Sequence, residues 1–246
     1  MEIRLIQQLN NLKVCDYHKV TKIYLHGETL TIHHERICYL INLQSLIIWD
    51  TNLTTLPDCM SSLVNLQVLF LCNNKLTTLP DSIRFLVNLQ TLNLSRTNLT
   101  ILPDCISFLV NLQTLNISSN KLIKLPDSIG SLVNLRTLDL NITEFTYLPD
   151  SIGLLVNLHS LGLWDSKIIT LPDTFYKISI YCYIKTKSEV LLNNLPNNLE
   201  YLCLEYSNIP LTNLPSSLIE LKLKHSNISS DKIKVPYGCK LIRVSS

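Results

Sequence analysis

The cysteines and histidines near the start of the chain come closest, by type and spacing, to a chemical site. Cys15 and His18 form a Cys-x-x-His pair, and His33 and Cys38 follow at a longer interval. Thiolates and imidazoles are the ligands that zinc prefers, although these intervals do not match the usual zinc spacings. The alternative is that Cys15 and Cys38 are small core residues beneath an N-terminal cap, with His33 and His34 in a loop. The sequence leaves both interpretations open and gives no basis for assigning a metal.

A second set of chemical groups is the aspartate that follows a proline at regular intervals along the chain. Because each aspartate has the same sequence surroundings, none stands out as a catalytic acid, and we predict that they cap short helical or 3-10 turns. The chain contains no G-x-S-x-G or Walker sequence, and its five glycines form no phosphate-binding loop. The sequence therefore predicts no enzymatic activity, no catalytic residue and no cofactor. The aspartates are Asp58, Asp81, Asp104, Asp127, Asp150 and Asp173.

The composition is that of a folded domain, because 246 residues with 46% hydrophobic content are enough for a continuous core. The net charge is only +2, although residues 177–246 carry nine Lys and Arg against five Asp and Glu. This excess is too small to predict nucleic acid binding. No stretch resembles a secretory signal or a membrane span, and the eight cysteines are scattered without a disulfide framework. We therefore expect a cytoplasmic protein with neither a membrane nor a nucleic acid partner.

The chain is dominated by an internal repeat in which the phrase Leu-Val-Asn-Leu recurs every 23 residues. Its last leucines are Leu66, Leu89, Leu112, Leu135 and Leu158. The period extends back to Leu43 and Val20 and forward to Tyr181, and shorter units follow from Leu199, Leu218 and Cys239. Within a unit the pattern is L-x-x-L-x-L-x-x-N-x-L, as in LQVLFLCNNKL at residues 66–76.

This pattern resembles the leucine-rich repeat family over residues 20–244. The 23-residue units resemble the intracellular Ras-group and plant-type repeats, and the shorter units are similar to repeats of bacterial effectors. The resemblance implies an α/β fold, a right-handed, horseshoe-shaped solenoid with a concave parallel sheet of about eleven short strands and short helical or 3-10 turns on the convex side. We expect residues 1–19 to form a cap segment and residues 20–246 to form the repeat domain.

The physics of the pattern favours the same architecture. In L-x-L the leucines point to one face of a strand and the intervening residues to the other. One such strand cannot bury its leucines alone, but stacked units share backbone hydrogen bonds and one core. We predict that the asparagine before each strand, as in Asn65 and Asn88, satisfies backbone groups in a tight turn. The consensus asparagine inside the repeat is present only at Asn74 and Asn120.

If the leucines are scaffold, binding residues must lie at the other positions of the concave sheet face. An apolar, aromatic patch is predicted from Tyr24, Ile47, Trp49, Val68 and Phe70. A polar middle follows from Asn93, Asn116, Asp139 and Asn141, and Trp164 lies beyond it. A basic end is predicted from Lys185, Lys187, Lys222, Lys224 and Arg243.

Such a face suits a protein partner, with Trp49 and Phe70 as anchors and the lysines attracting an acidic region. The alternative for the apolar patch is that residues 1–19 fold over it as a cap. At the other end the final strand has no recognisable cap, and its bare edge invites either disorder or pairing with a second copy of the chain as a homodimer. We therefore predict a non-enzymatic protein-protein interaction module. The alternative, which the family resemblance implies by analogy, is an adaptor or scaffold for a GTPase, phosphatase or ubiquitin-ligase complex.

Overall fold

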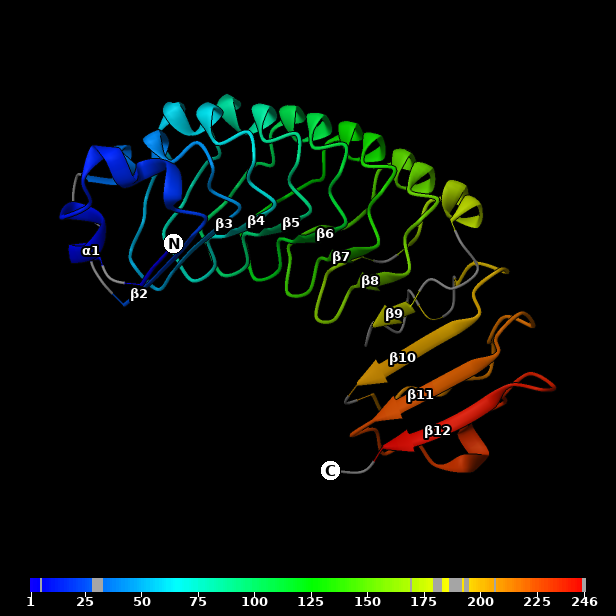
Figure 1. Cartoon of the computed structure of the whole chain (residues 1–246). Helices are drawn as coiled ribbons and strands as arrows, with labels where there is room; N and C mark the ends of the chain where they lie inside the picture. Colours follow the sequence, from blue (N-terminus) through cyan, green and yellow to red (C-terminus); the bar gives the residue numbers. More distant parts are fainter. Residues whose placement is uncertain are drawn as a thin grey trace.

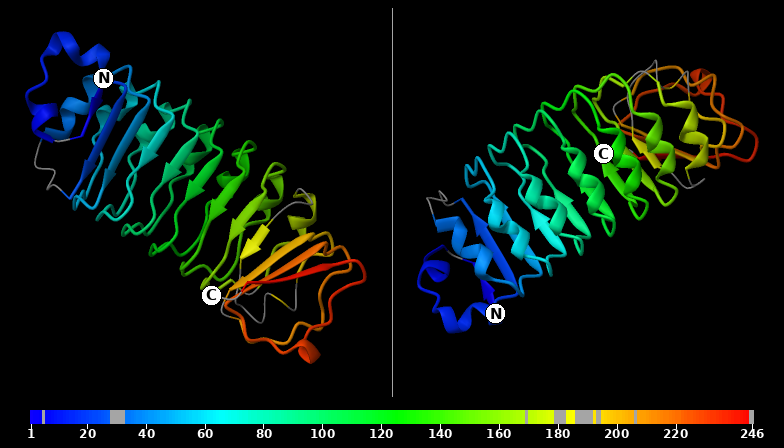
Figure 2. Two further views of the ribbon diagram at one scale, coloured as in Figure 1. Left: turned by 60° about the horizontal axis from the view of Figure 1, so that its bottom comes forward. Right: turned by 90° about the horizontal axis from the view of Figure 1, so that it is seen from above.

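All strands of the described chain belong to one parallel sheet, whose order follows the chain from β1 to β12. The computed structural model describes residues 1–4, 6–27, 33–168, 170–178, 183–185, 192, 195–205 and 207–244. The units stack into a curved solenoid with the sheet on the inner side and short helical turns on the outer side (Figures 1 and 2). The predicted solenoid is confirmed, with twelve strands where the repeat pattern predicts about eleven.

The extra strand comes from the segment before the first repeat. The strands are β1 Glu2–Ile3, β2 Lys22–His26, β3 Ser45–Trp49, β4 Val68–Phe70, β5 Thr91–Asn93, β6 Thr114–Asn116, β7 Thr137–Asp139, β8 Ser160–Gly162, β9 Tyr183–Lys185, β10 Tyr201–Glu205, β11 Glu220–Lys224 and β12 Lys240–Val244. The helices are α1 Ile6–Asn10 and the 3-10 helices η1 Val14–Lys19, η2 His33–Tyr39, η3 Asp58–Ser62, η4 Asp81–Phe85, η5 Asp104–Phe108, η6 Asp127–Ser131, η7 Asp150–Leu154, η8 Asp173–Lys177 and η9 Ser230–Lys232.

The leucines of the strands form one core that runs the length of the solenoid. Leu69, Leu92 and Leu115 are directly opposite one another in successive strands, and each is fully buried. From the outer side, isoleucines of the 3-10 helices, such as Ile83 and Ile106, complete the same core. Each unit therefore buries its strand leucines between its outer turn and the units on either side.

The outer turns begin in a different way from the one predicted. Pro80 is the N-cap of η4 with φ −72° and ψ 154°, and its carbonyl oxygen accepts a hydrogen bond from the Ile83 N–H at 3.1 Å. No side-chain hydrogen bond caps η3 through η8, so the prediction that the aspartates are caps is wrong. The extended proline takes the cap position, and the aspartate becomes the first helical residue, where its charge complements the free N–H groups.

The asparagines before the strands do satisfy backbone groups, as predicted, but in the neighbouring unit. The Nδ2 of Asn65 donates to the carbonyl oxygen of Ile41 at 2.9 Å, and that of Asn88 donates to Val64 at 2.8 Å. Asn42, Asn111, Asn134 and Asn157 make the same bond one unit back. These bonds lock the rotation of each unit relative to the one before it.

The consensus asparagines link units through the core. Asn74 is buried, its Oδ1 accepts from the N–H groups of Thr51 and Leu53 at 3.1 and 3.0 Å, and its Nδ2 donates to the carbonyl of Ile48 at 2.9 Å. The hydroxyl of Thr51 also donates to this Oδ1, at 2.9 Å. A threonine at the consensus position of one unit is thus hydrogen-bonded by the asparagine at that position in the next unit. This explains how the repeat tolerates threonine in place of asparagine in some units.

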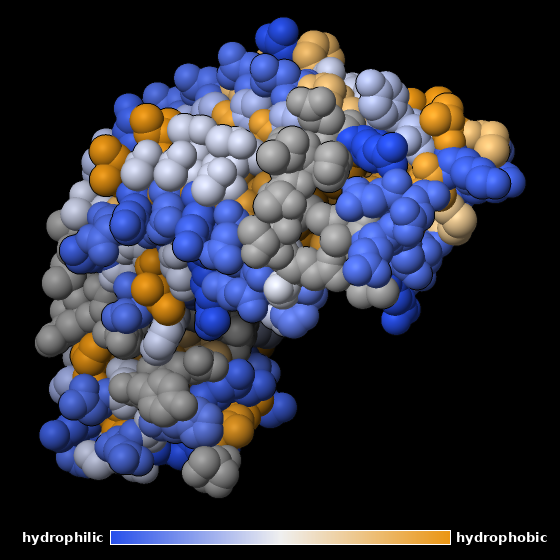
Figure 3. Space-filling model, turned by 90° about the vertical axis from the view of Figure 1, so that its left-hand side faces the viewer, coloured by the Kyte–Doolittle hydropathy of each residue, from blue (hydrophilic) through white to orange (hydrophobic). Residues whose placement is uncertain are grey.

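The N-terminal segment closes one end of the core. β1 pairs with β2 at the edge of the sheet, and Ile3 and Leu9 are buried in the main core. Seen from this end, the outer surface is mostly hydrophilic, with hydrophobic groups scattered over it (Figure 3). The segment therefore covers the leucines that the first repeat would otherwise expose.

The last strand is shifted by one residue from the predicted alignment. In the register of β11 and β12, Ile242 lies opposite Lys222 and Arg243 lies opposite Leu223. Arg243 is therefore on the core side of the sheet, where its Nη1 donates to the carbonyl of Ile228 at 2.9 Å. Its predicted place on the concave face is wrong, because a slip of one residue moves every side chain of a strand to the opposite face.

One turn residue adopts a backbone conformation that its side chain opposes. In successive units, one residue of the turn that follows the strand has a positive φ. Asn73 has φ 54° and Ser119 has φ 55° at this position. Ile142 holds this position with φ 54° and is 44% exposed. A β-branched residue is an outlier in this region, since its side chain crowds the backbone.

Ile142→Asn is therefore expected to raise the free energy of unfolding by about 1 kcal/mol. Ile123→Asn is the matched control, because Ile123 is 66% exposed and has no positive φ. Urea unfolding followed by circular dichroism measures both variants. Equal effects at the two positions would show that the gain comes from removing an exposed apolar side chain and not from the backbone.

Candidate partner-binding face

The strand register places the predicted concave residues in rows across the sheet. The central row is Tyr24, Ile47, Phe70, Asn93, Asn116, Asp139, Gly162, Lys185, Cys203, Lys222 and Ile242. Only its last member differs from the row predicted from the sequence. The row faces away from the leucine core, since alternate residues of a strand point to opposite faces.

The N-terminal concave patch consists of Tyr24, Ile47, Trp49, Val68 and Phe70 on three adjacent strands. Trp49 is 41% exposed and the other four are half-buried. The apolar residues that the sequence singled out are thus brought together at the surface.

Polar groups hold the rim of the N-terminal concave patch. The His26 ring stacks on Trp49 with centroids 3.7 Å apart and an interplanar angle of 19°. The Nε2 of His26 is 3.8 Å from Asp50 Oδ2, and Asp50 Oδ1 accepts from Asn73 Nδ2 at 2.9 Å. These contacts fix the orientation of the Trp49 ring at the surface.

The N-terminal segment does not fold over this patch within the described residues. Ile3 pairs with Ile23 on the core side, and Arg4 approaches the rim, with its Cζ 5.9 Å from the Tyr24 ring centroid. The segment lies beside the first repeat, where β1 extends the sheet (Figure 2). The alternative in which residues 1–19 cover the patch is therefore not what the structure shows.

The polar side chains in the middle of the face accept hydrogen bonds from nearby backbone N–H groups. The Oδ1 of Asn93 accepts from the Ser95 N–H at 2.9 Å, and that of Asn116 accepts from the Ser118 N–H at 3.0 Å. Asp139 accepts in the same way from the Asn141 N–H at 3.0 Å. These short-range bonds end the central strands after three residues and leave the side chains ordered.

Gly162 leaves room for the side chains of Asp139 and Asn141, on the preceding unit, to extend across the sheet. Asn141 Oδ1 accepts from the Trp164 N–H at 2.7 Å, and a Cβ added at Gly162 would lie 2.8 Å from Asp139 Oδ1. Any larger residue at this position would therefore displace Asp139 or Asn141. Half-buried Trp164 continues the face beyond this point.

The basic end is smaller than predicted. Lys222 and Lys224 are half-buried on β11, and Lys185 takes the equivalent place on β9. Lys187 lies outside the described residues, and Arg243 faces the core side. Glu205 lies opposite Lys224 in the register, so the end carries mixed charge.

The N-terminal zinc hypothesis fails at one of its four residues. Cys38 forms a disulfide with Cys59, with the two Cα atoms 5.6 Å apart. The alternative interpretation, in which both cysteines are small core residues, holds for Cys38, which is buried, and is wrong for Cys15, which is an exposed free thiol. Within the described chain, no group of three or more His, Cys, Asp or Glu residues could hold a metal ion. The Cys38–Cys59 bond could not be predicted from the cysteine spacing, because the two residues come together only when the outer turns η2 and η3 stack.

The free thiol of Cys72, two residues after Phe70, is not activated as a nucleophile. Cys72 is half-buried on β4's continuation, and burial raises the pKa of its thiol above the ordinary value. A raised pKa keeps the thiol protonated at neutral pH, and the protonated form is a poor nucleophile. Nothing in the pKa of Cys72 therefore points to a reactive nucleophile at this position.

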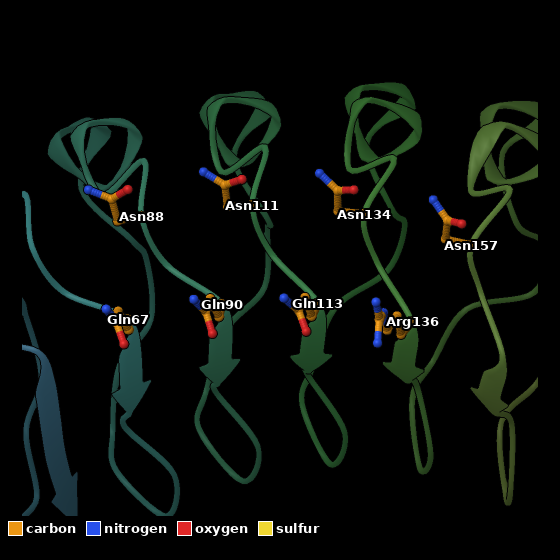
Figure 4. A pocket seen from close by; sticks show the side chains of 8 residues that line it. All are labelled: Gln67, Asn88, Gln90, Asn111, Gln113, Asn134, Arg136 and Asn157. Carbon is orange, nitrogen blue, oxygen red and sulfur yellow. The ribbon is translucent and has the colours of Figure 1, made fainter.

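A polar groove lies where the strands begin, and its residues were not predicted as a site. It has a volume of about 560 Å³. We call it the amide groove; its lining is Gln67, Asn88, Gln90, Asn111, Gln113, Asn134, Arg136 and Asn157 (Figure 4). The sequence signal was the glutamine that follows Leu-Val-Asn-Leu in successive units, which its regular recurrence made easy to assign to the scaffold.

These features define a class of protein: a non-globular repeat solenoid with a leucine core and an open concave sheet. Two stretches of the chain match models of the leucine-rich repeat, and the stacked units repeat the same pattern beyond them. The Leucine rich repeat family models match residues 41–99 and residues 111–132. No curated protein matches the chain. Among solved structures it is similar to a leucine-rich repeat protein of Leptospira interrogans, with 26% identity and a TM-score of 0.60 over 100% of this chain and 82% of that one.

Leucine-rich repeat domains are in general protein-protein interaction modules that bind protein partners. In the part of the chain that the structure describes, no helix has the length and apolar character needed to span a membrane. The family and the fold thus give the general class of function, and the particular face and partner need separate arguments.

The disulfide generates a stability prediction with an internal control. Cys59→Ser should lower the free energy of unfolding by about 3 kcal/mol, because the bond closes a loop of 21 residues. Cys105→Ser changes the equivalent residue two units later, which is a free thiol, and should have a small effect. Thermal unfolding with and without dithiothreitol measures both. If dithiothreitol leaves the melting temperature of the unmodified chain unchanged, the bond contributes no stability.

Proposed function

We propose that the chain binds another protein through its concave face, with the N-terminal concave patch as the main contact. The observation that carries the proposal is the row of Tyr24, Ile47 and Phe70 on adjacent strands beside exposed Trp49. The other face of these strands already fills the core, so packing does not require apolar residues here. Large exposed apolar clusters on ordered sheets are typical of interaction sites.

The partner has two expected features. An apolar or aromatic segment contacts Trp49 and Phe70, and an acidic region lies toward Lys185, Lys222 and Lys224. The charges affect the rate of encounter more than the affinity, because Lys222 and Lys224 are only half-buried and are screened by salt. Asn93, Asn116, Asp139, Asn141 and Trp164 lie between the two ends and supply ordered polar contacts in this proposal.

The proposed role is binding without catalysis. Adaptor or scaffold function for a GTPase, phosphatase or ubiquitin-ligase complex is a narrower form of the same proposal and rests on family analogy alone. Affinity capture followed by mass spectrometry distinguishes the two. Recovery of subunits from such complexes would support the narrower form.

The cytoplasmic location stays a prediction from the sequence. The Cys38–Cys59 bond favours an oxidising compartment instead, since disulfides are rare where thiols are kept reduced. Fractionation of cells that produce the chain, with alkylation of free thiols before lysis, measures both the location and the redox state.

The Trp49→Ala/Phe70→Ala double variant tests the concave face. Loss of the two anchors should weaken partner capture about thirtyfold or more. The free energy of unfolding should fall by only about 1 kcal/mol, because neither ring lies in the leucine core. Capture from lysate with quantitative mass spectrometry and a parallel urea melt are the two measurements.

The matched control is Phe108→Ala/Tyr147→Ala, which removes two aromatics that are 55% and 57% exposed outside the concave face. Capture by this control should equal capture by the unmodified chain. A large loss of stability in the Trp49/Phe70 variant, or equal loss of capture in both variants, would contradict the proposal.

A second proposal concerns the outer edge of β12. Its residues are exposed or half-buried throughout, including Leu241 and Val244, whereas those of β11 alternate between half-buried and buried. An uncovered edge strand offers backbone N–H and C=O groups to another strand. Two copies paired about a two-fold axis at Ile242 would place each Lys240 opposite Val244 of the other copy, so no like charges meet. We propose that this edge forms a homodimer.

Ile242→Lys would bring two lysines together at the two-fold axis and should shift the dimer to monomer. Ile219→Lys is the control, because Ile219 is 47% exposed and lies outside β12. Sedimentation velocity of each purified chain gives the mass in solution. A monomeric unmodified chain, or a dimer that Ile242→Lys leaves intact, would contradict the homodimer.

A further inference from the structure

The amide groove is built from two parallel rows of side chains, of which the asparagine row is already oriented. The Nδ2 of Asn111 donates to the Val87 carbonyl at 2.9 Å, and that of Asn134 donates to Val110 at 2.9 Å. With each nitrogen bonded to the preceding unit, the side-chain oxygens all turn the same way (Figure 4). The row therefore presents hydrogen-bond acceptors at regular intervals.

The glutamine row is held in register by the sheet while its amides remain available. The backbone N–H of Gln90 donates to the Gln67 carbonyl, and that of Gln113 donates to Gln90, both at 2.8 Å. Gln67 and Gln90 are exposed and Gln113 is half-buried. Among the hydrogen bonds of the described residues, none uses the side-chain amides of these three glutamines. Each amide offers one acceptor and two donated hydrogens.

The chemistry of the two rows selects a neutral, polyhydroxylated ligand. Arg136, at one end, is the single charged residue that lines the groove. A hydroxyl can donate and accept at once, so it can bond to either atom of an amide and to an asparagine oxygen. A phosphate or a polyanion would find acceptor oxygens along the groove and only one cation.

The spacing between the strands, each of which contributes one Gln or Arg and one Asn to the groove, disfavours an extended peptide. Neighbouring strands are about 4.8 Å apart, whereas equivalent groups of an extended peptide recur at about 6.8 Å, every second residue. A peptide that crosses the strands would therefore lose register within two strands. A linear glycan carries hydroxyls on every sugar unit and can meet successive strands along its length.

We propose that the amide groove is a binding site for a linear, neutral oligosaccharide that lies across the strand starts between Gln67 and Asn157. The site lies at the beginning of the strands and adjoins the N-terminal concave patch only where Gln67 precedes Val68, and it does not depend on the proposed protein partner. Its affinity comes from several weak hydrogen bonds in series, so it increases with the length of the glycan.

The test is isothermal titration of the full chain with cellohexaose, maltohexaose and chitohexaose, each compared with its monosaccharide. We expect saturable binding of at least one hexasaccharide and none of its monosaccharide. Gln90→Leu/Gln113→Leu should weaken that binding at least tenfold. Gln44→Leu is the matched control, because Gln44 has the same place in its repeat, is exposed and lies outside the groove, and should leave binding unchanged.

Thermal unfolding of each variant shows that the fold is retained, and the Trp49→Ala/Phe70→Ala variant should bind the hexasaccharide normally. The proposal is overturned if no hexasaccharide binds, or if Gln44→Leu weakens binding as much as the groove variant. A flexible Gly-Ser peptide of similar length that binds as tightly would also overturn it, since the groove would then recognise a peptide backbone.

Discussion

The structure depends on one interaction: the burial of each strand's leucines against those of the strands on either side. Leu115 and Leu138 lie side by side in register on adjacent strands, and both are fully buried. Because the apolar area is shared between units, the solenoid is stable only as an array. Both ends of the array are therefore special, and they are where the chain departs from its repeat.

Polar groups make this stacking specific. Asn74 satisfies backbone groups of the preceding unit and of its own unit inside the core, and Asn88 donates to one carbonyl of the preceding unit at the surface. Leucines alone would tolerate small rotations between units, but an unpaired buried N–H or C=O costs free energy. The resulting rigid frame holds the residues of the concave face and of the amide groove at fixed spacing, which suits both to extended contacts.

Prediction from the sequence succeeds where the repeat is regular and fails where local alternatives are close in energy. The rows through Ile47, Phe70 and Asn93 follow from the 23-residue period alone. The last strand was misaligned by one residue at Arg243, because its unit is short and Leu241 and Ile242 are equally apolar choices for the core face. The Cys38–Cys59 bond was missed because it joins two units whose outer turns meet only in three dimensions.

The sequence by itself determined the solenoid, its leucine core and the composition of most of the concave face, since a strict period leaves one way to bury every leucine. Tertiary structure decided which residues act at the ends and between the units. Stacking brought Trp49 against His26, placed the N-terminal segment beside the patch and aligned Gln67, Gln90 and Gln113 into a groove. These arrangements depend on distances between neighbouring units, and the register of the sheet sets those distances.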